Sequence, residues 1–312
     1  MKLIHLNENR RGPRSNTSLF TRPISHSANH RFNFVITLNI AVFSNCVYNC
    51  ALIPDLSFFM RHIVLAAVRI FLVTIALLVI CIVSIFMCML VPTNRNKAHY
   101  TAKFVGALAK LFGIDVEIRM PKEIEELGPV VYVANHQNSY DIFTVSASLP
   151  KRTVSVGKKS LRLIPFFGQM YWFTGNILLD RNNRSKAHGT ITATADKIKQ
   201  RKISVWLFPE GTRSYGKGLL PFKTGAFHTA KQADVPVVPV CVSNTHDMVD
   251  LNRWDNGKMI IEFLAPINVN DGSRESIRHI ANNTHEIMLA KITDISIEAG
   301  NELINAETAK AG

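Results

Sequence analysis

The chain contains little cysteine and little acidic charge for its length. Its 312 residues include five cysteines and 23 acidic residues, against 36 lysines and arginines. An odd number of cysteines at irregular spacing excludes a disulfide framework and predicts reduced thiols in a chain that faces the cytoplasm. Charged residues make up only 19% of the chain and hydrophobic residues 47%, which excludes a disordered or low-complexity protein.

The scarcity of acidic residues leaves a formal net charge of +13. A basic protein favours anionic partners such as nucleic acid, anionic lipid or phosphorylated substrates. Residues 142–231 contain 16 basic and three acidic residues, so this window accounts for the whole net charge. We expect the window to form a face that meets an anionic membrane surface or binds phosphate, with an ordinary solvated face as the alternative.

One long apolar run stands out toward the end of the first third of the chain. Residues 70–91 contain no charged side chain, and as a helix they would extend about 33 Å, close to the roughly 30 Å of a hydrocarbon core. We therefore predict a membrane-embedded helical segment at 60–95, which either spans the bilayer or lies in one leaflet. A buried core helix and a signal peptide are the alternatives. Arg69 lies near enough to the helix end to reach the interface.

Residues 1–59 differ from the rest of the chain. The first thirty are rich in Asn, Ser, Arg and Pro, and the uncharged stretch at 32–53 contains four asparagines that make it a poor bilayer span. Met60 is followed by Arg61 and the apolar run, as a natural chain start would be. We predict that 1–59 are a disordered or non-native extension and that 301–312 form a frayed tail.

Between residues 96 and 300, short β-branched runs alternate with helical stretches, which predicts a layered α/β domain. Near-continuous apolar runs suit strands that are covered on both faces. The Val-Pro-x-x-Pro-Val run is expected at a sheet edge or a bulge, because proline cannot donate to a ladder, with an ordinary core strand as the alternative. Strands are expected at 130–134, 153–156, 203–208, 235–242 and 259–263, and helices around 191–198 and 277–295.

A polar motif, Asn-His-Gln-Asn-Ser-Tyr-Asp, follows the expected strand at 130–134. Loops at the carboxyl ends of strands are where α/β sheets build their sites. His136 and Asp141 are five residues apart across a bend, so the carboxylate can bind one ring nitrogen while the other takes a proton. We interpret the pair as a general base for a substrate hydroxyl, with an ordinary surface histidine as the alternative. No metal site is predicted, because no cysteine or second histidine lies nearby.

A second polar motif, Phe-Pro-Glu-Gly-Thr-Arg-Ser, follows the expected strand at 203–208. Gly211 allows close backbone approach, while Thr212 and Arg213 offer a hydroxyl and a planar guanidinium to phosphate. Glu210 is expected either to hold Arg213 in place or to contact a substrate hydroxyl. An ordinary polar turn is the alternative.

Two further stretches indicate substrate contacts. Gly-Asn-Ile-Leu-Leu-Asp-Arg ends in Arg181, a candidate second phosphate ligand. Five aromatic residues lie between Phe166 and Phe173, and we expect them at a membrane interface or along an acyl chain, with core packing as the alternative.

The four motifs, taken in order, resemble the four sequence blocks of the glycerolipid acyltransferase family. These are Asn-His-x4-Asp, Gly-x5-Arg, Phe-Pro-Glu-Gly-Thr-Arg-Ser and Val-Pro-x-x-Pro-Val, and supporting stretches lie at 156–161, 164–169, 180–184 and 219–227. Leu178 and Leu179 stand where the family often has Phe-Ile, and residues 1–59 have no counterpart.

The resemblance implies an acyltransferase domain with a mixed central sheet behind a membrane-embedded helix. It implies acyl transfer from acyl-CoA or acyl-carrier protein to the sn-2 hydroxyl of lysophosphatidic acid, which gives phosphatidic acid. In that reaction His136 would take the hydroxyl proton and Asp141 would orient His136. The glycerol phosphate would be held by Arg181, Glu210, Gly211, Thr212 and Arg213, with Lys158 or Lys159.

The same resemblance implies no cofactor, no metal and no nucleic-acid partner. It places the protein in the bacterial inner membrane, with the catalytic domain facing the cytoplasm. Two other functions stay open: a sibling acyltransferase that uses glycerol 3-phosphate or another lysophospholipid, and a membrane-anchored basic module that binds anionic lipid or nucleic acid without chemistry.

Overall fold

The computed structural model describes residues 56–180, 184–269 and 274–301. The chain divides after Phe58 into two compact units, and the unit from Phe59 onward contains the features discussed below. The predicted extension at 1–59 and the predicted tail at 301–312 lie almost entirely outside the described residues.

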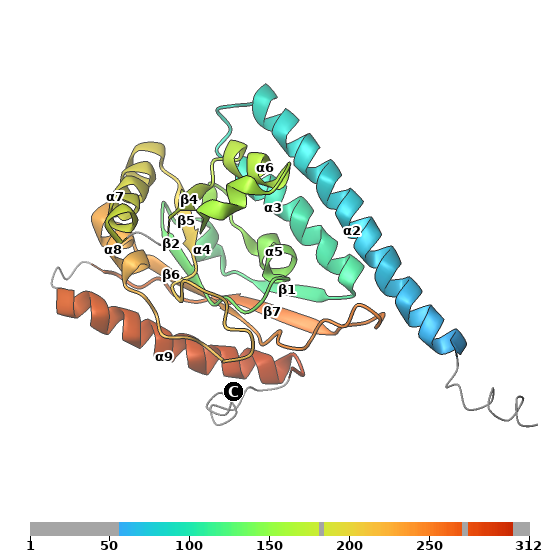
Figure 1. Ribbon diagram of the computed structural model, residues 1–312. Helices are drawn as coiled ribbons and strands as arrows, with labels where there is room; N and C mark the ends of the chain where they lie inside the picture. Colours follow the sequence, from blue (N-terminus) through green and yellow to red (C-terminus); the bar gives the residue numbers. More distant parts are fainter. Residues whose placement is uncertain (1–55, 181–183, 270–273, 302–312) are drawn as a thin grey trace, which may run out of the picture. The chain divides into compact units, whose positions relative to one another are not determined.

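A seven-stranded mixed sheet forms the centre of the second unit, which confirms the predicted fold class (Figure 1). The strand order is β1-β7-β6-β2-β5-β3-β4, and only β6 and β7 pair in antiparallel fashion. The carboxyl ends of β6, β2, β5, β3 and β4 therefore share one edge of the sheet. The strands are β1 (Asp115–Arg119), β2 (Val131–Ala134), β3 (Thr153–Lys158), β4 (Ile177–Leu179), β5 (Ser204–Leu207), β6 (Val237–Val242) and β7 (Lys258–Phe263).

Two of these strands were not predicted, and one lies in an unexpected place. Strand β4 is only three residues long and β1 is partly exposed throughout, so neither shows a continuous apolar run. The predicted edge position of β6 is wrong, because β6 lies between β7 and β2. Pro239 is tolerated because the ladder with β7 begins only at Val240, and the chain after β7 returns as Ile267 opposite Val237. The missing N–H of Pro239 falls in this gap.

Helices cover both faces of the sheet (Figure 1). Helices α7, α8 and α9 lie on one face, while α3, α5 and α6 lie on the other with α2 outside α3. The α-helices are α2 (Leu56–Leu90), α3 (Lys97–Ala107), α4 (Lys122–Glu125), α5 (Asp141–Thr144), α6 (Phe167–Phe173), α7 (Arg184–Arg201), α8 (Gly225–Ala233) and α9 (Arg274–Glu298). The 3-10 helices are η1 (Leu108–Phe112), η2 (Val145–Ser148) and η3 (Lys159–Leu163).

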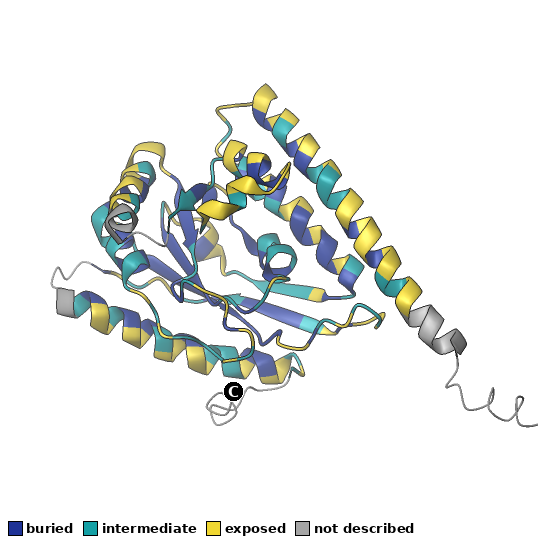
Figure 2. Cartoon of the chain, viewed as in Figure 1, coloured by how far each residue is buried: buried dark blue, intermediate teal, exposed yellow. Residues whose placement is uncertain are grey.

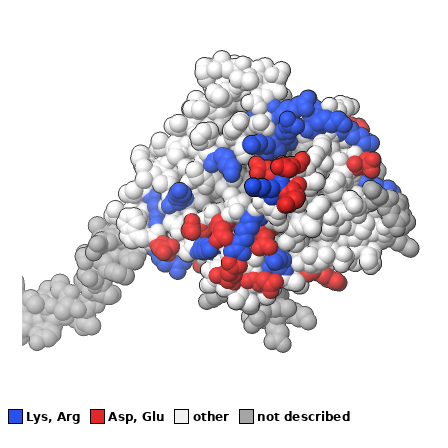
Figure 3. Space-filling view, turned by 180° about the vertical axis from the view of Figure 1, so that it is seen from behind, with Lys and Arg blue, Asp and Glu red and all other residues white. Residues whose placement is uncertain are grey.

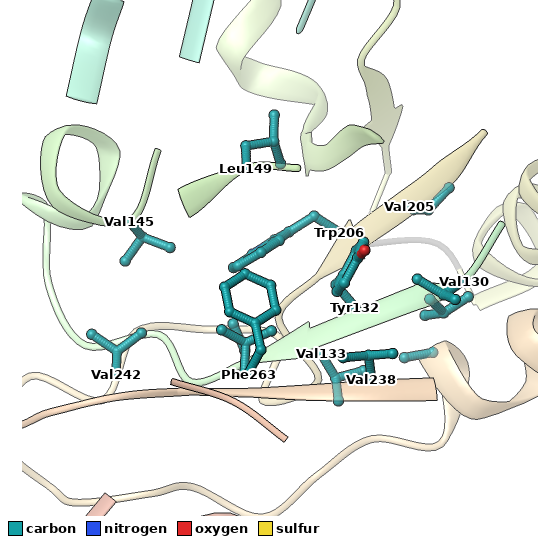
Figure 4. Packing of buried hydrophobic residues seen from close by; sticks show 14 of the residues in the cluster. Val130, Tyr132, Val133, Val145, Leu149, Val205, Trp206, Val238, Val242 and Phe263 are labelled. Atoms are coloured by element: carbon teal, nitrogen blue, oxygen red, sulfur yellow. The ribbon is translucent and has the colours of Figure 1, made fainter. Parts of the chain in front are cut away.

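The core lies between the central strands and the helices (Figure 4). Val131 and Val133 of β2 point to one face of the sheet and Tyr132 to the other, because side chains alternate along a strand. Tyr132 lies opposite Trp206 of β5, and both rings contact Phe263 of β7 at centroid distances of 5.8 and 6.1 Å. This aromatic cluster fills the face of the sheet that lies under the candidate site.

Helix α2 packs along the domain over much of its length. Its buried positions form one stripe through Val73, Cys81 and Cys88, whereas its opposite face is exposed and apolar (Figure 2). By length and composition alone, Ile63–Leu90 is able to cross a membrane. Both faces of α2 are therefore mainly apolar: one stripe packs against the domain, and the opposite stripe is exposed.

The Arg69 side chain turns toward the domain instead of extending along the exposed face of α2. Its guanidinium is buried and donates to the backbone carbonyls of Leu251 at 3.0 Å and Trp254 at 2.9 Å, and also to that of Arg253. It also lies over the Trp254 ring, 5.7 Å from the centroid. We call these contacts the Arg69 anchor; they join α2 to the loop between β6 and β7.

Replacing Arg69 with methionine should destabilise the fold. The change leaves several backbone carbonyls without their donor, and each buried unsatisfied group costs about 1–3 kcal/mol. We expect the melting temperature in detergent to fall by about 5–10 °C, measured by calorimetry or circular dichroism. The exposed Arg95, beyond the other end of α2, provides the control, and an equal loss in Arg95→Met would contradict the anchor.

Candidate active site

Two polar loops meet because the strands that precede them are neighbours. Strands β2 and β5 pair in parallel, with Val133 opposite Leu207, so the loops after their carboxyl ends lie side by side. The first loop carries His136 and the second carries Glu210. The two motifs, 74 residues apart in the chain, therefore form one site.

His136 and Asp141 are in direct contact, as the spacing predicted. The Nδ1–H of His136 donates to Asp141 Oδ2 at 2.6 Å, which leaves Nε2 of the ring able to accept a proton. The ring also stacks on Phe208, with centroids 4.2 Å apart and planes 20° apart. Together the carboxylate and the stacked ring fix the orientation of the imidazole.

Asp141 accepts its hydrogen bonds through one carboxylate oxygen. Its Oδ2 also accepts hydrogen bonds from the backbone N–H groups of Gln137 at 2.7 Å and Asn138 at 3.3 Å. Its Oδ1 is buried and has no hydrogen-bond partner among the described residues. A cation on the imidazole is the group best placed to satisfy this charge, so the pair stabilises imidazolium once a proton has been taken up.

Glu210 joins the two loops through their backbones. Its Oε1 accepts a hydrogen bond from the N–H of His136 at 2.6 Å, and its Oε2 accepts one from the N–H of Leu220 at 3.0 Å. The residue is 3% exposed, and burial raises the pKa of its carboxyl to about 7, although the two N–H donors act in the opposite direction. Both oxygens bind backbone groups, so Glu210 does not hold Arg213; that side chain donates to Tyr215 Oη instead.

Three amide side chains attach the His136 loop to the end of β6, and the sequence did not reveal them. Asn135 exchanges two hydrogen bonds with the backbone of Val242, at 2.9 and 2.8 Å. Gln137 donates to the carbonyl of Ser243 at 2.8 Å and accepts from the N–H of Thr245 at 2.7 Å. Asn138 likewise binds Thr245. The available signal was a run of amides directly after a fully buried strand.

Gly211 lies in a turn that favours glycine. Its φ is +73°, and a Cβ there would lie 2.6 Å from Lys223 Nζ. The N–H of Lys223 donates to the carbonyl of Pro209 at 2.9 Å, which keeps its side chain beside the turn. Lys223 is therefore a cationic neighbour of the motif whose place here the sequence did not predict.

A cavity of about 710 Å³ opens at this edge of the sheet. His136 and Asp141 line it together with Gly211, Thr212, Arg213 and Lys158, so the predicted base and four predicted phosphate ligands share one space. Much of the rest of its wall is apolar and comes from α3, β3, η2, η3 and α6, including Ala98, Val105, Val145, Val156, Leu161, Phe167 and Met170. The cavity thus offers a cationic polar end and an apolar side.

The remaining predicted ligands are placed differently. Lys158, the last residue of β3, lines the cavity, whereas the exposed Lys159 pairs with Asp180 at 3.6 Å. Arg181 lies outside the described residues. The structure therefore distinguishes Lys158 from Lys159, which the sequence did not.

The basic window at 142–231 is divided between two edges of the sheet. Lys158 at the carboxyl end of β3 and Arg213 after β5 line the cavity, whereas Lys151 and Arg152 precede β3 and Lys202 precedes β5. On the rear face, basic side chains run along one edge and mix with acidic ones below it (Figure 3). Among the described residues of the window, Lys158 and Arg213 share the cavity with His136. Contact with an anionic membrane stays a prediction.

The aromatic stretch at 166–173 forms α6 and the residue before it, and its side chains lie in two different environments. Phe167 and Tyr171 line the cavity, while Phe166 and Trp172 are exposed. Contact of the exposed rings with a membrane and contact of the cavity rings with an acyl chain stay predictions. No group of three His, Cys, Asp or Glu side chains within the described ranges is placed to hold a metal ion.

Comparisons with known proteins agree with this architecture. A model of the acyltransferase family matches residues 115–243. The 1-acyl-sn-glycerol-3-phosphate acyltransferase of Salmonella typhimurium is 49% identical over 221 residues, which cover 71% of this chain and 90% of the relative. That of Escherichia coli is 48% identical over 230 residues, covering 74% and 94%. The chain belongs to the acyltransferase family. It is therefore an enzyme, and its resemblance to the family is confirmed.

The fold of this acyltransferase also has a solved counterpart. The crystal structure of the 1-acyl-sn-glycerophosphate acyltransferase from Thermotoga maritima superposes with a TM-score of 0.62 at 22% identity, covering 76% of this chain and 97% of that chain. At that identity the match supports the fold alone.

The buried Glu210 should make the stability of this acyltransferase depend on pH. Its pKa rises from 4.5 to about 7 on folding, so between these values the folded state binds more protons than the unfolded state. The free energy of unfolding, relative to Glu210→Gln, should fall by roughly 3 kcal/mol as the pH rises from 4.5 to 7. Denaturant titrations across this range measure the difference. The exposed Glu286→Gln is the control, and a parallel pH dependence of wild type and Glu210→Gln would refute the assignment.

Proposed function

We propose that this acyltransferase transfers an acyl group from a thioester to the sn-2 hydroxyl of 1-acyl-sn-glycerol 3-phosphate and so forms phosphatidic acid. The observation that carries the proposal is the cavity that holds an aspartate-bound histidine and a guanidinium together. The names of relatives at 48–49% identity support the same acceptor.

His136 acts as the general base. Its Nε2 takes the proton of the acceptor hydroxyl while the hydroxyl oxygen attacks the thioester carbonyl carbon, and the imidazolium so formed is stabilised by Asp141 Oδ2 on Nδ1–H. The tetrahedral intermediate then collapses, the carbon–sulfur bond breaks, and the thiolate receives the proton from His136. No acyl-enzyme is required, because the attacking oxygen belongs to the substrate.

The phosphate of the acceptor is held at the cationic end of the cavity. Arg213 supplies a planar pair of donors, Thr212 a hydroxyl and Gly211 a backbone that a ligand can approach. Lys158 is the lysine that lines the cavity, and Arg181 is proposed from its motif alone. Glu210 contributes by positioning His136 and the turn, rather than by touching phosphate.

The acyl donor is acyl-CoA or acyl-carrier protein, and neither a cofactor nor a metal takes part. The apolar wall formed by α3, η2 and α6 accommodates an acyl chain, since most of its side chains present hydrocarbon to the cavity. Anionic lipid at the membrane surface and the absence of a nucleic-acid partner belong to the same proposal.

Helix α2 keeps the enzyme in the membrane without crossing it. Its packed stripe contacts the domain from the Arg69 anchor to Cys88, a distance of about 28 Å, so the domain would enter the hydrocarbon if α2 stood upright. The exposed apolar stripe instead rests in one leaflet, beside the exposed aromatics of α6. We place the enzyme at the bacterial inner membrane, with the catalytic domain facing the cytoplasm.

Removing the imidazole should abolish acyl transfer. We expect His136→Ala to lower kcat by about 10²–10⁴-fold, because the hydroxyl then lacks its base. The measurement is phosphatidic acid formed from lysophosphatidic acid and labelled acyl-CoA in membranes. His279→Ala, on the exposed side of α9, is the matched control, and substantial turnover by His136→Ala would remove the general-base assignment.

Removing the guanidinium should weaken acceptor binding. We expect Arg213→Ala to raise the acceptor KM by about 10–100-fold with a smaller change in kcat, since the lost bonds form in the ground state as well. Initial rates over a range of lysophosphatidic acid concentrations test this, with Arg278→Ala as the control on α9. A fall in kcat at unchanged KM would contradict phosphate binding by Arg213.

A further inference from the structure

Tyr215, which the sequence motifs do not include, adopts an unfavourable backbone conformation. Its φ is +46°, in the left-handed region that bulky side chains rarely occupy. The next residue, Gly216, has φ +82° and adopts such values without strain. A glycine at 215 would therefore suit the turn better than the tyrosine that is present.

Burial does not compensate for this strain, because 56% of Tyr215 is exposed. Strained residues persist where the surrounding structure holds them, and they cluster at functional sites. The backbone of Tyr215 is held by its N–H, which donates to the carbonyl of Gln137 at 2.9 Å. The conformation thus places a tyrosine side chain at the junction of the two catalytic loops.

The side chain of Tyr215 has two polar neighbours there. Arg213 Nη1 donates to Tyr215 Oη at 3.1 Å, and Ser139 of the His136 loop is the second neighbour. These two neighbours, Arg213 most of all, hold the pKa of the phenol below its ordinary value. Tyr215 lines the same cavity as Arg213 and His136.

We propose that Tyr215 is a positioning residue that fixes the guanidinium of Arg213 toward the substrate phosphate. The inference rests on the proposed function, since it assigns a task to the proposed phosphate ligand. An arginine at an exposed position samples many rotamers, and a hydrogen bond to one terminal nitrogen restricts the fork to one orientation. The other donors of the guanidinium remain available for phosphate oxygens.

The first test removes only the hydroxyl. Tyr215→Phe should raise the KM for lysophosphatidic acid by about 3–10-fold while kcat changes less than twofold. Tyr100→Phe, an exposed tyrosine on α3, should leave both constants unchanged. An unchanged KM in Tyr215→Phe would overturn the proposal.

A double-mutant cycle shows whether Tyr215 acts through Arg213. In an Arg213→Lys background, which keeps the charge but lacks the fork, Tyr215→Phe should change KM less than twofold. An undiminished effect in that background would show that Tyr215 acts independently of Arg213, and the proposal would be wrong. A wild-type enzyme that does not acylate lysophosphatidic acid at all would refute the proposed function instead.

Tyr215→Gly separates this role from a structural one. Glycine relieves the strain, so the melting temperature should stay the same or rise while the KM rises as in Tyr215→Phe. With 1-acylglycerol, an acceptor without phosphate, both variants should match the wild type within about twofold. A lower melting temperature with an unchanged KM would show that Tyr215 serves the fold alone.

Discussion

The buried carboxylate of Glu210 is the contact on which the site depends. Neighbouring parallel strands bring the two loops to one edge, but pairing ends at Val133 and Leu207, before either loop begins. From there onward, Glu210 holds the backbone of His136 on one side and that of Leu220 on the other. The N–H groups of Ser214 and Tyr215 add backbone hydrogen bonds to the same His136 loop. A carboxylate is suited to this task because its two oxygens accept from donors on opposite sides, and burial makes such bonds strong.

This role of Glu210 explains why an acidic residue lies within the basic window at 142–231. Glu210 faces two N–H groups rather than a lysine or arginine, so it does not neutralise the cations that we propose as phosphate ligands. Asp180, by contrast, pairs with Lys159, a lysine that does not line the cavity. The distribution of acidic residues thus decides which basic residues remain available to a ligand.

Much of the fold and the pairing of His136 with Asp141 could be predicted from the sequence. Strands that are buried on both faces produce continuous apolar runs in the sequence. Residues five apart across a bend are brought close together by the bend itself, so their contact is easy to predict. The sequence could not show β4, which is too short for a pattern, or the interior position of β6, which depends on where β7 ends. The role of Glu210 and the place of Lys223 also escaped prediction, because both depend on backbone groups that are distant in the chain. Tyr215 was missed for a related reason, since its strain exists only in the folded turn.

The Arg69 anchor has a mechanical consequence. Helix α2 is attached to the domain at Arg69 and again at Cys81, which packs against Phe167 and Met170, so two contacts about 18 Å apart prevent it from pivoting. Because α2 is attached at two places, the helix and the domain rotate together as one rigid body. If the thickness of the proposed membrane tilts α2, the whole catalytic domain therefore turns with the helix. The height of the cavity mouth above the bilayer then changes, while the angle between α2 and the domain stays the same.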